Sequence, residues 1–210
     1  LLFDPGTEWN YSYSTDVLGR VVEVVSGLTL DSYMNENIFQ PLGMVDTGFS
    51  VPNGEESRFA SCYFPQGENK QAALLDDALR SPYLREPIGL SGGGGLVSTL
   101  ADYHRFTQAL RNNGALDEQR IIGRKTLQFM TRNHLPGGVD LTQYGRPLFS
   151  ETTYDGVGFG LGFSVVVDPT KAKVLSQEGE YGWGGAASTA FWVDPVEDLT
   201  VIFLTQLLPS

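Results

Sequence analysis

Residues 3–14 read FDPGTEWNYSYS, and the interpretation of the whole chain works outward from this stretch. A tyrosine phenol in water has a pKa near ~10, so tyrosine is a weak base at neutral pH. It becomes a usable base when a neighbouring cation favours the phenolate or joins a proton relay. Taken alone, the triplet Tyr11-Ser12-Tyr13 is more typical of a packed tyrosine where a helix begins. The surrounding sequence therefore has to decide what Tyr11 does.

A helix is predicted directly after this stretch, over residues 16–27, with Ser14 or Thr15 as its cap and Gly27 at its end. Apolar side chains recur at the spacing of one helical face, and we expect that face to be buried: Val17, Leu18, Val21, Val22 and Val25. A second helix is predicted over residues 30–38, ending before Pro41 because proline disfavours a continuing helix.

The middle of the chain alternates between irregular and helical sequence. Residues 50–90 lack clear periodicity and are predicted to form a long irregular excursion. After the glycines at 92–95, Thr99 and Asp102 form a capping-box-like pair. We expect the helix that they open to bury a stripe made of Leu100, Tyr103, Phe106, Thr107 and Leu110. A further helix is predicted over residues 125–132.

From Gly156 onward the hydrophobic pattern becomes strand-like, with candidate strands at 157–167, 173–177, 187–193 and 199–206. Helices followed by an antiparallel meander predict an α+β fold. We divide the chain into a mainly helical region at 1–155, which carries the tyrosine and the long irregular loop, and a region of antiparallel strands at 156–210.

Composition excludes several classes of function. Fourteen basic and 25 acidic residues give a net charge of −11, which disfavours nucleic acid as a partner. One cysteine and two widely separated histidines predict no metal site, and we expect no cofactor. The sequence contains no apolar run long enough to predict a membrane span. The first residues do not resemble a signal peptide and lack an initiator methionine, so we interpret Leu1 as an interior point of a longer chain. A cytoplasmic and a periplasmic location of bacterial type are equally compatible with the sequence.

Five ordered blocks resemble the serine β-lactamase and penicillin-binding-protein-like hydrolases. The first stretch is similar to the family pattern F-x-PG-x-x-W-x-YS. The others are residues 41–47 (PLGMVDT), residues 93–102 (GGGLVSTLAD), the glycine-rich residues 158–162, and residues 182–195 around Trp183. The resemblance implies an antiparallel sheet flanked by helices, plus a helical region. The blocks match only the C-terminal portion of that fold, so its N-terminal part is expected to be missing.

The resemblance implies that Tyr11 is the catalytic base. The family's nucleophile lies in a Ser-x-x-Lys motif, and no such motif occurs in these 210 residues. We therefore expect these residues alone to hydrolyse no ester, and we expect a missing N-terminal segment of the same protein to act as their partner. A start close to Leu1 would instead favour a truncated, inactive domain that binds or assembles.

The block at Trp183-Gly184-Gly185 separates branches of the family. β-Lactamases and penicillin-binding proteins have Lys-Thr-Gly here, whose cation and hydroxyl serve the β-lactam carboxylate. Trp-Gly-Gly offers an apolar wall and bare backbone, which resembles the carboxylesterase branch (family VIII esterases). The backbone N–H of Ala186 would then donate to the oxyanion. By itself Trp183 is also typical of a strand-edge aromatic, and the glycines of a bulge.

A further departure concerns Tyr13, which stands where the family often has asparagine. We expect Tyr13 to be a wall of the substrate pocket or simply a packed aromatic. The sequence thus predicts a serine hydrolase that acts on a small-molecule ester or amide through an acyl-enzyme. Its alternatives are a β-lactamase or D-Ala-D-Ala peptidase/transpeptidase, and the inactive binding domain.

Overall fold

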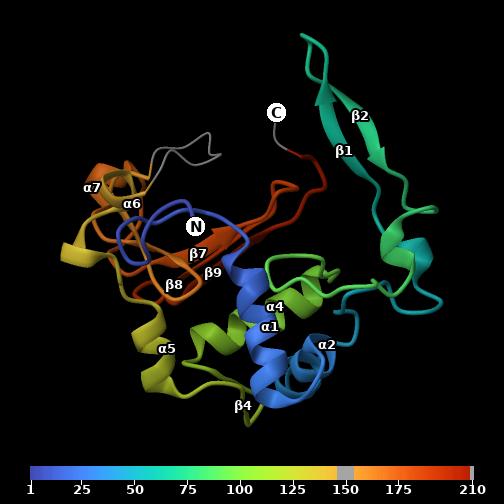
Figure 1. Cartoon of the computed structure of the whole chain (residues 1–210), viewed down its shortest axis with the longest axis horizontal. Coiled ribbons are helices and arrows are strands. Elements are labelled where there is room, and N and C mark those ends of the chain that lie inside the picture. Colours follow the sequence, from blue (N-terminus) through green and yellow to red (C-terminus); the bar gives the residue numbers. More distant parts are fainter. Residues whose placement is uncertain (146–153, 209–210) are drawn as a thin grey trace.

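The computed structural model describes residues 1–145 and 154–208. Of the predicted first region, residues 146–153 lie outside the described residues. Figure 1 shows a body in which helices pack beside one antiparallel sheet, with a hairpin projecting from it. The helices are α1 (Ser14–Ser26), α2 (Leu30–Met34), α3 (Gln40–Leu42), α4 (Leu100–Arg111), α5 (Arg124–Met130), α6 (Leu141–Tyr144) and α7 (Pro169–Ala172).

The main sheet has five strands in the order β5-β6-β7-β8-β9, and every neighbouring pair is antiparallel. Two small hairpins lie outside it, β1–β2 and β3–β4. The strands are β1 (Cys62–Gln66), β2 (Gln71–Asp76), β3 (Ala115–Leu116), β4 (Gln119–Arg120), β5 (Val157–Phe159), β6 (Ser164–Val166), β7 (Tyr181–Gly184), β8 (Ala190–Asp194) and β9 (Leu199–Phe203). This sheet with its helices is the antiparallel α+β arrangement that the sequence predicted.

The main core lies between the sheet and the helices α4 and α5. In the β7–β8 register, Tyr181 lies opposite Val193 and Trp183 opposite Phe191, so these four side chains share one face of the sheet. Leu110 of α4 packs into the same cluster, together with Leu127 of α5. A second cluster joins α4 to the α2–α3 region. Helix α4 is therefore buried on two sides and fixes the sheet against the N-terminal helices.

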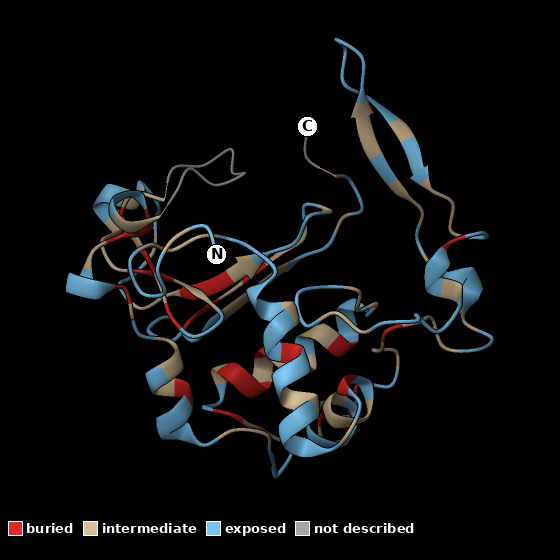
Figure 2. Cartoon of the chain, in the orientation of Figure 1, coloured by how far each residue is buried: buried red, intermediate tan, exposed pale blue. Residues whose placement is uncertain are grey.

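Helix α1 forms where predicted, but the prediction that its apolar face is buried is wrong. Val17, Leu18, Val21 and Val25 are all exposed, and Figure 2 shows α1 mostly in the exposed colour. The helix has a single buried position. That position is Gly19, which packs against the glycine loop at 92–95. The reason is geometric, because α1 makes its close contact at Gly19, which has no Cβ, and not through its apolar side chains.

Five other local predictions were wrong. The predicted strand at 157–167 is two antiparallel strands, β5 and β6. Leu100, predicted in the buried stripe of α4, is 56% exposed. The predicted excursion at 50–90 contains the hairpin β1–β2, which pairs over five residues of each strand. The predicted strand at 173–177 is absent, because α7 ends with Lys173 in a left-handed conformation at φ 57°. The second helix does not stop before Pro41. It widens into a π-helical turn at Asn35–Phe39 and continues as α3, where Pro41 lies in the first turn and its missing N–H costs no helical hydrogen bond.

Candidate active site

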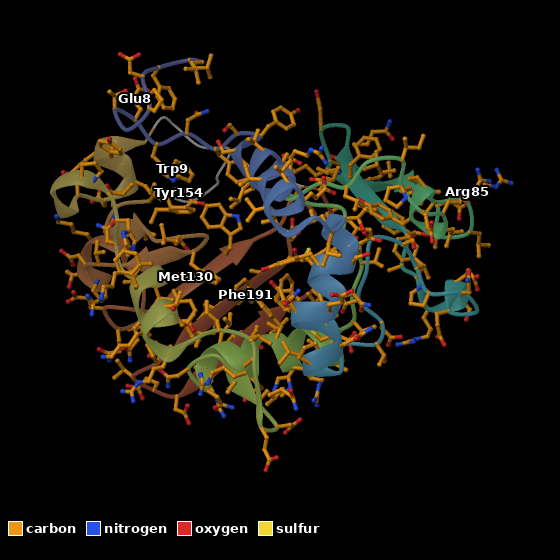
Figure 3. All side chains as sticks on the ribbon, turned by 60° about the horizontal axis from the view of Figure 1, so that its bottom comes forward. Glu8, Trp9, Arg85, Met130, Tyr154 and Phe191 are labelled. Carbon is orange, nitrogen blue, oxygen red and sulfur yellow. The ribbon has the colours of Figure 1, made fainter. Side chains whose placement is uncertain are left out.

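The N-terminal loop that carries Tyr11 is tied to α6. The Trp9 N–H donates to the Tyr144 carbonyl at 3.2 Å, and Trp9 forms an isolated parallel bridge with Gly145. The Tyr144 hydroxyl donates to the Gly6 carbonyl on the same loop. Figure 3 shows Trp9 on the side of the loop that faces the sheet. The backbone on the N-terminal side of Tyr11 is therefore fixed before α1 begins.

Tyr11 and Trp183 meet although they lie at opposite ends of the sequence. Their rings are stacked at 5.9 Å with an interplanar angle of 28°. Trp9 lies 6.5 Å from both rings and 4.9 Å from Phe159, which in turn meets Trp183 edge-on at 5.3 Å. We call Trp9, Tyr11, Phe159 and Trp183 the aromatic cluster. Such ring pairs contribute about 0.5–1.5 kcal/mol each beyond their buried area, so the cluster links the loop to the sheet.

The phenol of Tyr11 remains open to solvent. Tyr11 is 54% exposed. Within residues 1–145 and 154–208 its hydroxyl makes no hydrogen bond. The ring is therefore held by stacking, while the oxygen is free to meet a substrate or a proton partner. That combination is compatible with acid–base chemistry, which requires access to the proton being moved.

The turn after β7 carries the predicted backbone donor, Ala186, three residues after Trp183. The Gly185 N–H donates to the Thr189 carbonyl at 2.8 Å, and the Ser188 N–H donates back to the Gly185 carbonyl at 3.0 Å. A Cβ on Gly185 would lie 2.3 Å from the Thr189 hydroxyl oxygen, so a larger residue there would require the Thr189 side chain to shift. In the described part of the chain the exposed Ala186 N–H has no hydrogen-bond partner. It is therefore available to donate to an oxyanion.

Tyr13 lies apart from this arrangement. It occupies the cap position before α1, is 83% exposed, and among the described residues makes no ring contact with the aromatic cluster. Its assignment to a pocket wall stays a prediction. The structure brings Tyr11 and Trp183 into contact. Gly184 and Gly185 directly follow Trp183 in the chain.

Two members of the aromatic cluster, Trp9 and Phe159, were not singled out as site residues from the sequence. A signal for Trp9 is its spacing of two residues from Tyr11, because side chains two apart in extended backbone share a face. Phe159 lies in the glycine-rich residues 158–162, and its pairing with β6 does not indicate which ring it meets. Only the tertiary structure brings it to Trp9.

The glycine loop at 92–95 packs against the start of α1, the helix that follows Tyr11. A Cβ on Gly92 would lie 2.2 Å from the Thr15 carbonyl, so this loop packs tightly against the start of α1. The Ser91 hydroxyl donates to the Asp16 carboxylate from the same loop. These contacts position the helix that follows Tyr11, and they explain the glycine run without a bound phosphate.

Asp102 joins two of the sequence blocks. Its buried carboxylate accepts from the Asp46 N–H at 2.7 Å and from the Thr47 hydroxyl at 2.8 Å. Its own N–H donates to the Thr99 hydroxyl oxygen at 3.3 Å, which caps α4 as predicted. Arg58 pairs with Asp46 through two nitrogens, and this hydrogen-bonded pair holds the pKa of the Asp46 carboxyl below its usual range. These residues build the helical scaffold.

A hollow of about 220 Å³ lies along β7 and β8. Its lining includes Ser164, Gly182 and Trp192, which share a face by register. Because neighbouring residues of a strand point to opposite faces, this face is the one opposite the Trp183 side chain. Burial raises the pKa of the Glu180 carboxyl at its rim, and Asp194 adds to the effect. Trp183 and Gly184 also line the hollow, so it borders the aromatic cluster at β7.

Among the described residues, no group of three or more histidine, cysteine, aspartate or glutamate side chains is arranged to hold a metal ion. No helix in residues 1–145 and 154–208 is both long and apolar enough to cross a membrane.

Comparisons with known proteins agree on one family. The family model described as "Beta-lactamase" matches residues 1–210. Protein Rv1367c of Mycobacterium tuberculosis is 33% identical, over 100% of this chain and 51% of its own length. Esterase EstB of Burkholderia gladioli is 33% identical, over 98% of this chain and 51% of its length. The solved structure of EstCE1, a hydrolase with promiscuous acyltransferase activity, superposes with a TM-score of 0.78 at 27% identity, over 99% of this chain and 54% of that chain. The chain thus spans about half the length of these relatives.

Proposed function

The chain belongs to the beta-lactamase family and has the β-lactamase/transpeptidase-like fold, and on that premise we propose that the complete protein is a serine hydrolase of carboxylic esters. Family relatives include an esterase and a hydrolase with acyltransferase activity. In this proposal the 210 residues supply the general base, one oxyanion donor and an apolar wall. The nucleophilic serine and its lysine come from residues outside them.

The observation that carries the proposal is the stacking of Tyr11 on Trp183 at 5.9 Å. The stacking supports the proposal because Trp183 lies in β7 (Tyr181–Gly184), and the chain continues from β7 through Gly185 to Ala186. Among the described residues the Ala186 N–H has no hydrogen-bond partner. In this proposal the base, the wall and the oxyanion donor come together from two segments that are distant in the sequence. Convergence of this kind is what acyl transfer requires.

The proposed reaction has two halves. In the first, the serine oxygen forms a bond to the ester carbonyl carbon while Tyr11, paired with the lysine, accepts the serine proton. The tetrahedral oxyanion is held by backbone N–H groups, including that of Ala186. Its collapse breaks the bond to the alcohol, which leaves with the proton from Tyr11. In the second half, water attacks the acyl-enzyme and repeats the proton transfers, releasing the acid and the serine.

Trp183 and Gly184 favour an ester over a β-lactam. A β-lactam carries a carboxylate, and Lys-Thr-Gly would offer it a cation and a hydroxyl. Here the same positions offer an indole ring and a glycine. A charge-assisted hydrogen bond contributes about 1.5–3 kcal/mol, so its absence lowers β-lactam specificity by roughly 10- to 100-fold.

The test compares p-nitrophenyl butyrate with nitrocefin on the complete protein. We expect the higher kcat/KM for the ester. Trp183→Lys combined with Gly184→Thr should narrow the ratio of the two values by about tenfold or more, because it restores the cation. Trp183→Gln combined with Gly184→Thr is the matched control, since it removes the same ring without adding charge. A higher wild-type value for nitrocefin, or equal ratios in the two double variants, contradicts the proposal.

A further inference from the structure

The aromatic cluster contains a ring with no assigned task, Trp9, and we infer that Trp9 is a positioning residue for Tyr11. Its ring holds the Tyr11 phenol in the stacked orientation on Trp183, beside the turn that carries the oxyanion donor. Trp9 acts through Tyr11 and touches no reacting atom in this account. The inference rests on the proposed function, because it concerns the orientation of the proposed base.

The need for such a residue follows from how loosely Tyr11 is otherwise held. Its side chain is mostly exposed, and in the described part of the chain its hydroxyl has no partner. The ring contacts that restrain it come from Trp9 at 6.5 Å and Trp183 at 5.9 Å. A tyrosine with one exposed face samples several side-chain rotamers, and each unproductive rotamer lowers the fraction of competent enzyme.

Trp9 is itself fixed well enough to do this. Its backbone N–H donates to the Tyr144 carbonyl, and its β-bridge to Gly145 anchors the loop at the end of α6. Its ring packs against Phe159 at 4.9 Å and meets Trp183 at 6.5 Å. Trp9 thus contacts all three other rings of the aromatic cluster. Two of those rings lie on strands of the sheet, so Trp9 restrains Tyr11 relative to the sheet.

The first test measures ester hydrolysis by the complete protein carrying Trp9→Leu or Trp9→Phe, with p-nitrophenyl acetate as a substrate too small to depend on the apolar wall. For Trp9→Leu we expect kcat to fall by about tenfold with little change in KM, since misplacing a catalytic group lowers the rate of the chemical step. Trp9→Phe keeps a ring and should lose only about two- to fivefold. An unchanged kcat in Trp9→Leu, or a loss confined to KM, overturns the inference.

Trp192→Leu is the matched control, because Trp192 is a half-buried indole on β8 outside the aromatic cluster. Rates are compared per mole of folded protein, measured by circular dichroism. We expect Trp192→Leu to keep the wild-type kcat. A tenfold loss in Trp192→Leu as well would mean that any missing indole slows the enzyme, and would overturn a special role for Trp9.

A double-mutant cycle separates positioning from general support of the fold. If Trp9 acts through the Tyr11 oxygen, adding Trp9→Leu to Tyr11→Phe lowers kcat no further. Equal losses in both backgrounds would overturn the inference. Should Trp9→Leu fail to fold, Trp9→Phe carries the same cycle, and its smaller loss must likewise vanish in the Tyr11→Phe background. If Tyr11→Phe alone retains full activity, the proposed function fails. If Tyr11→Phe is inactive and Trp9→Leu is not, only the role of Trp9 fails.

Discussion

Two groups of aromatic side chains in this molecule use the same ring geometry for different ends. We call Tyr103, Phe163, Tyr181 and Phe191 the core ring group. Its edge-on pairs lie between α4 and the sheet, at centroid distances of 5.2–6.3 Å. The aromatic cluster around Tyr11 has similar spacings but lies at the surface end of the sheet. Trp183 touches both, since it also packs against the buried core.

The difference between the two groups teaches what makes a tyrosine available for chemistry. Burial raises the pKa of Tyr103 to about 12, and it raises the pKa of Tyr181 to about 12 as well. Burial thus holds those two phenols in the protonated form more firmly than water does, and both rings pack in the core cluster. Tyr11 rests on rings of the same kind but leaves its oxygen in solvent. Location, and not residue type, separates a structural tyrosine from a candidate base.

The largest expected effect is on folding, from the centre of the core ring group. Phe191→Ala in the complete protein should lower the free energy of unfolding by about 3–5 kcal/mol, because Phe191 is 7% exposed and its removal leaves a cavity. Tyr11→Ala should cost less, about 1–3 kcal/mol, since it loses two ring pairs but leaves no closed cavity at the surface. Urea unfolding measures both. Equal costs would break the distinction between the two groups.

A smaller effect sharpens the same contrast through pH. The folded-state pKa of Tyr103 is raised to about 12 from 10.0, so the folded state holds this proton more tightly. The resulting stability is fully present below about pH 10 and is lost as pH rises toward about 12. Tyr103→Phe should flatten this decline by about 1–2 kcal/mol, given that a pKa difference of one unit corresponds to about 1.4 kcal/mol. Unfolding free energies from pH 8 to 12 decide this, and parallel curves for Tyr103→Phe and wild type would contradict it.

Much of the fold followed from the sequence because the patterns are local. The helices α4 and α5 and the strands β8 and β9 form near the predicted positions, where periodicity and capping agree. The α1 and α4 stripes show where such inference ends. Both have helical spacing, but Leu110 of α4 meets the sheet while Val21 of α1 is exposed. Periodicity predicts that a helix has an apolar face, but it does not predict which element packs against that face.

The site shows the same limit. Tyr11, Trp183 and Ala186 were predicted as site residues from motifs, because a motif specifies which residue types occur at which spacing, and their roles stay a prediction. The ring contacts of Trp9 and Phe159 depend on loop and sheet packing, which no short pattern encodes. The hairpin β1–β2 was missed for a related reason: its strand residues alternate poorly, and Pro65 lies within β1.

The central claim is that Tyr11 moves the proton in ester cleavage, and acylation of the complete protein by p-nitrophenyl butyrate tests it most directly. The release of p-nitrophenol in the first turnover reports acylation, and mass spectrometry reports the butyryl adduct. We expect Tyr11→Phe to slow acylation by about 10²- to 10⁴-fold, the range typical for loss of a general base. Tyr13→Phe, the neighbouring tyrosine that is 83% exposed, should acylate at the wild-type rate. Acylation of Tyr11→Phe at the wild-type rate, with an equally folded protein, would contradict the account.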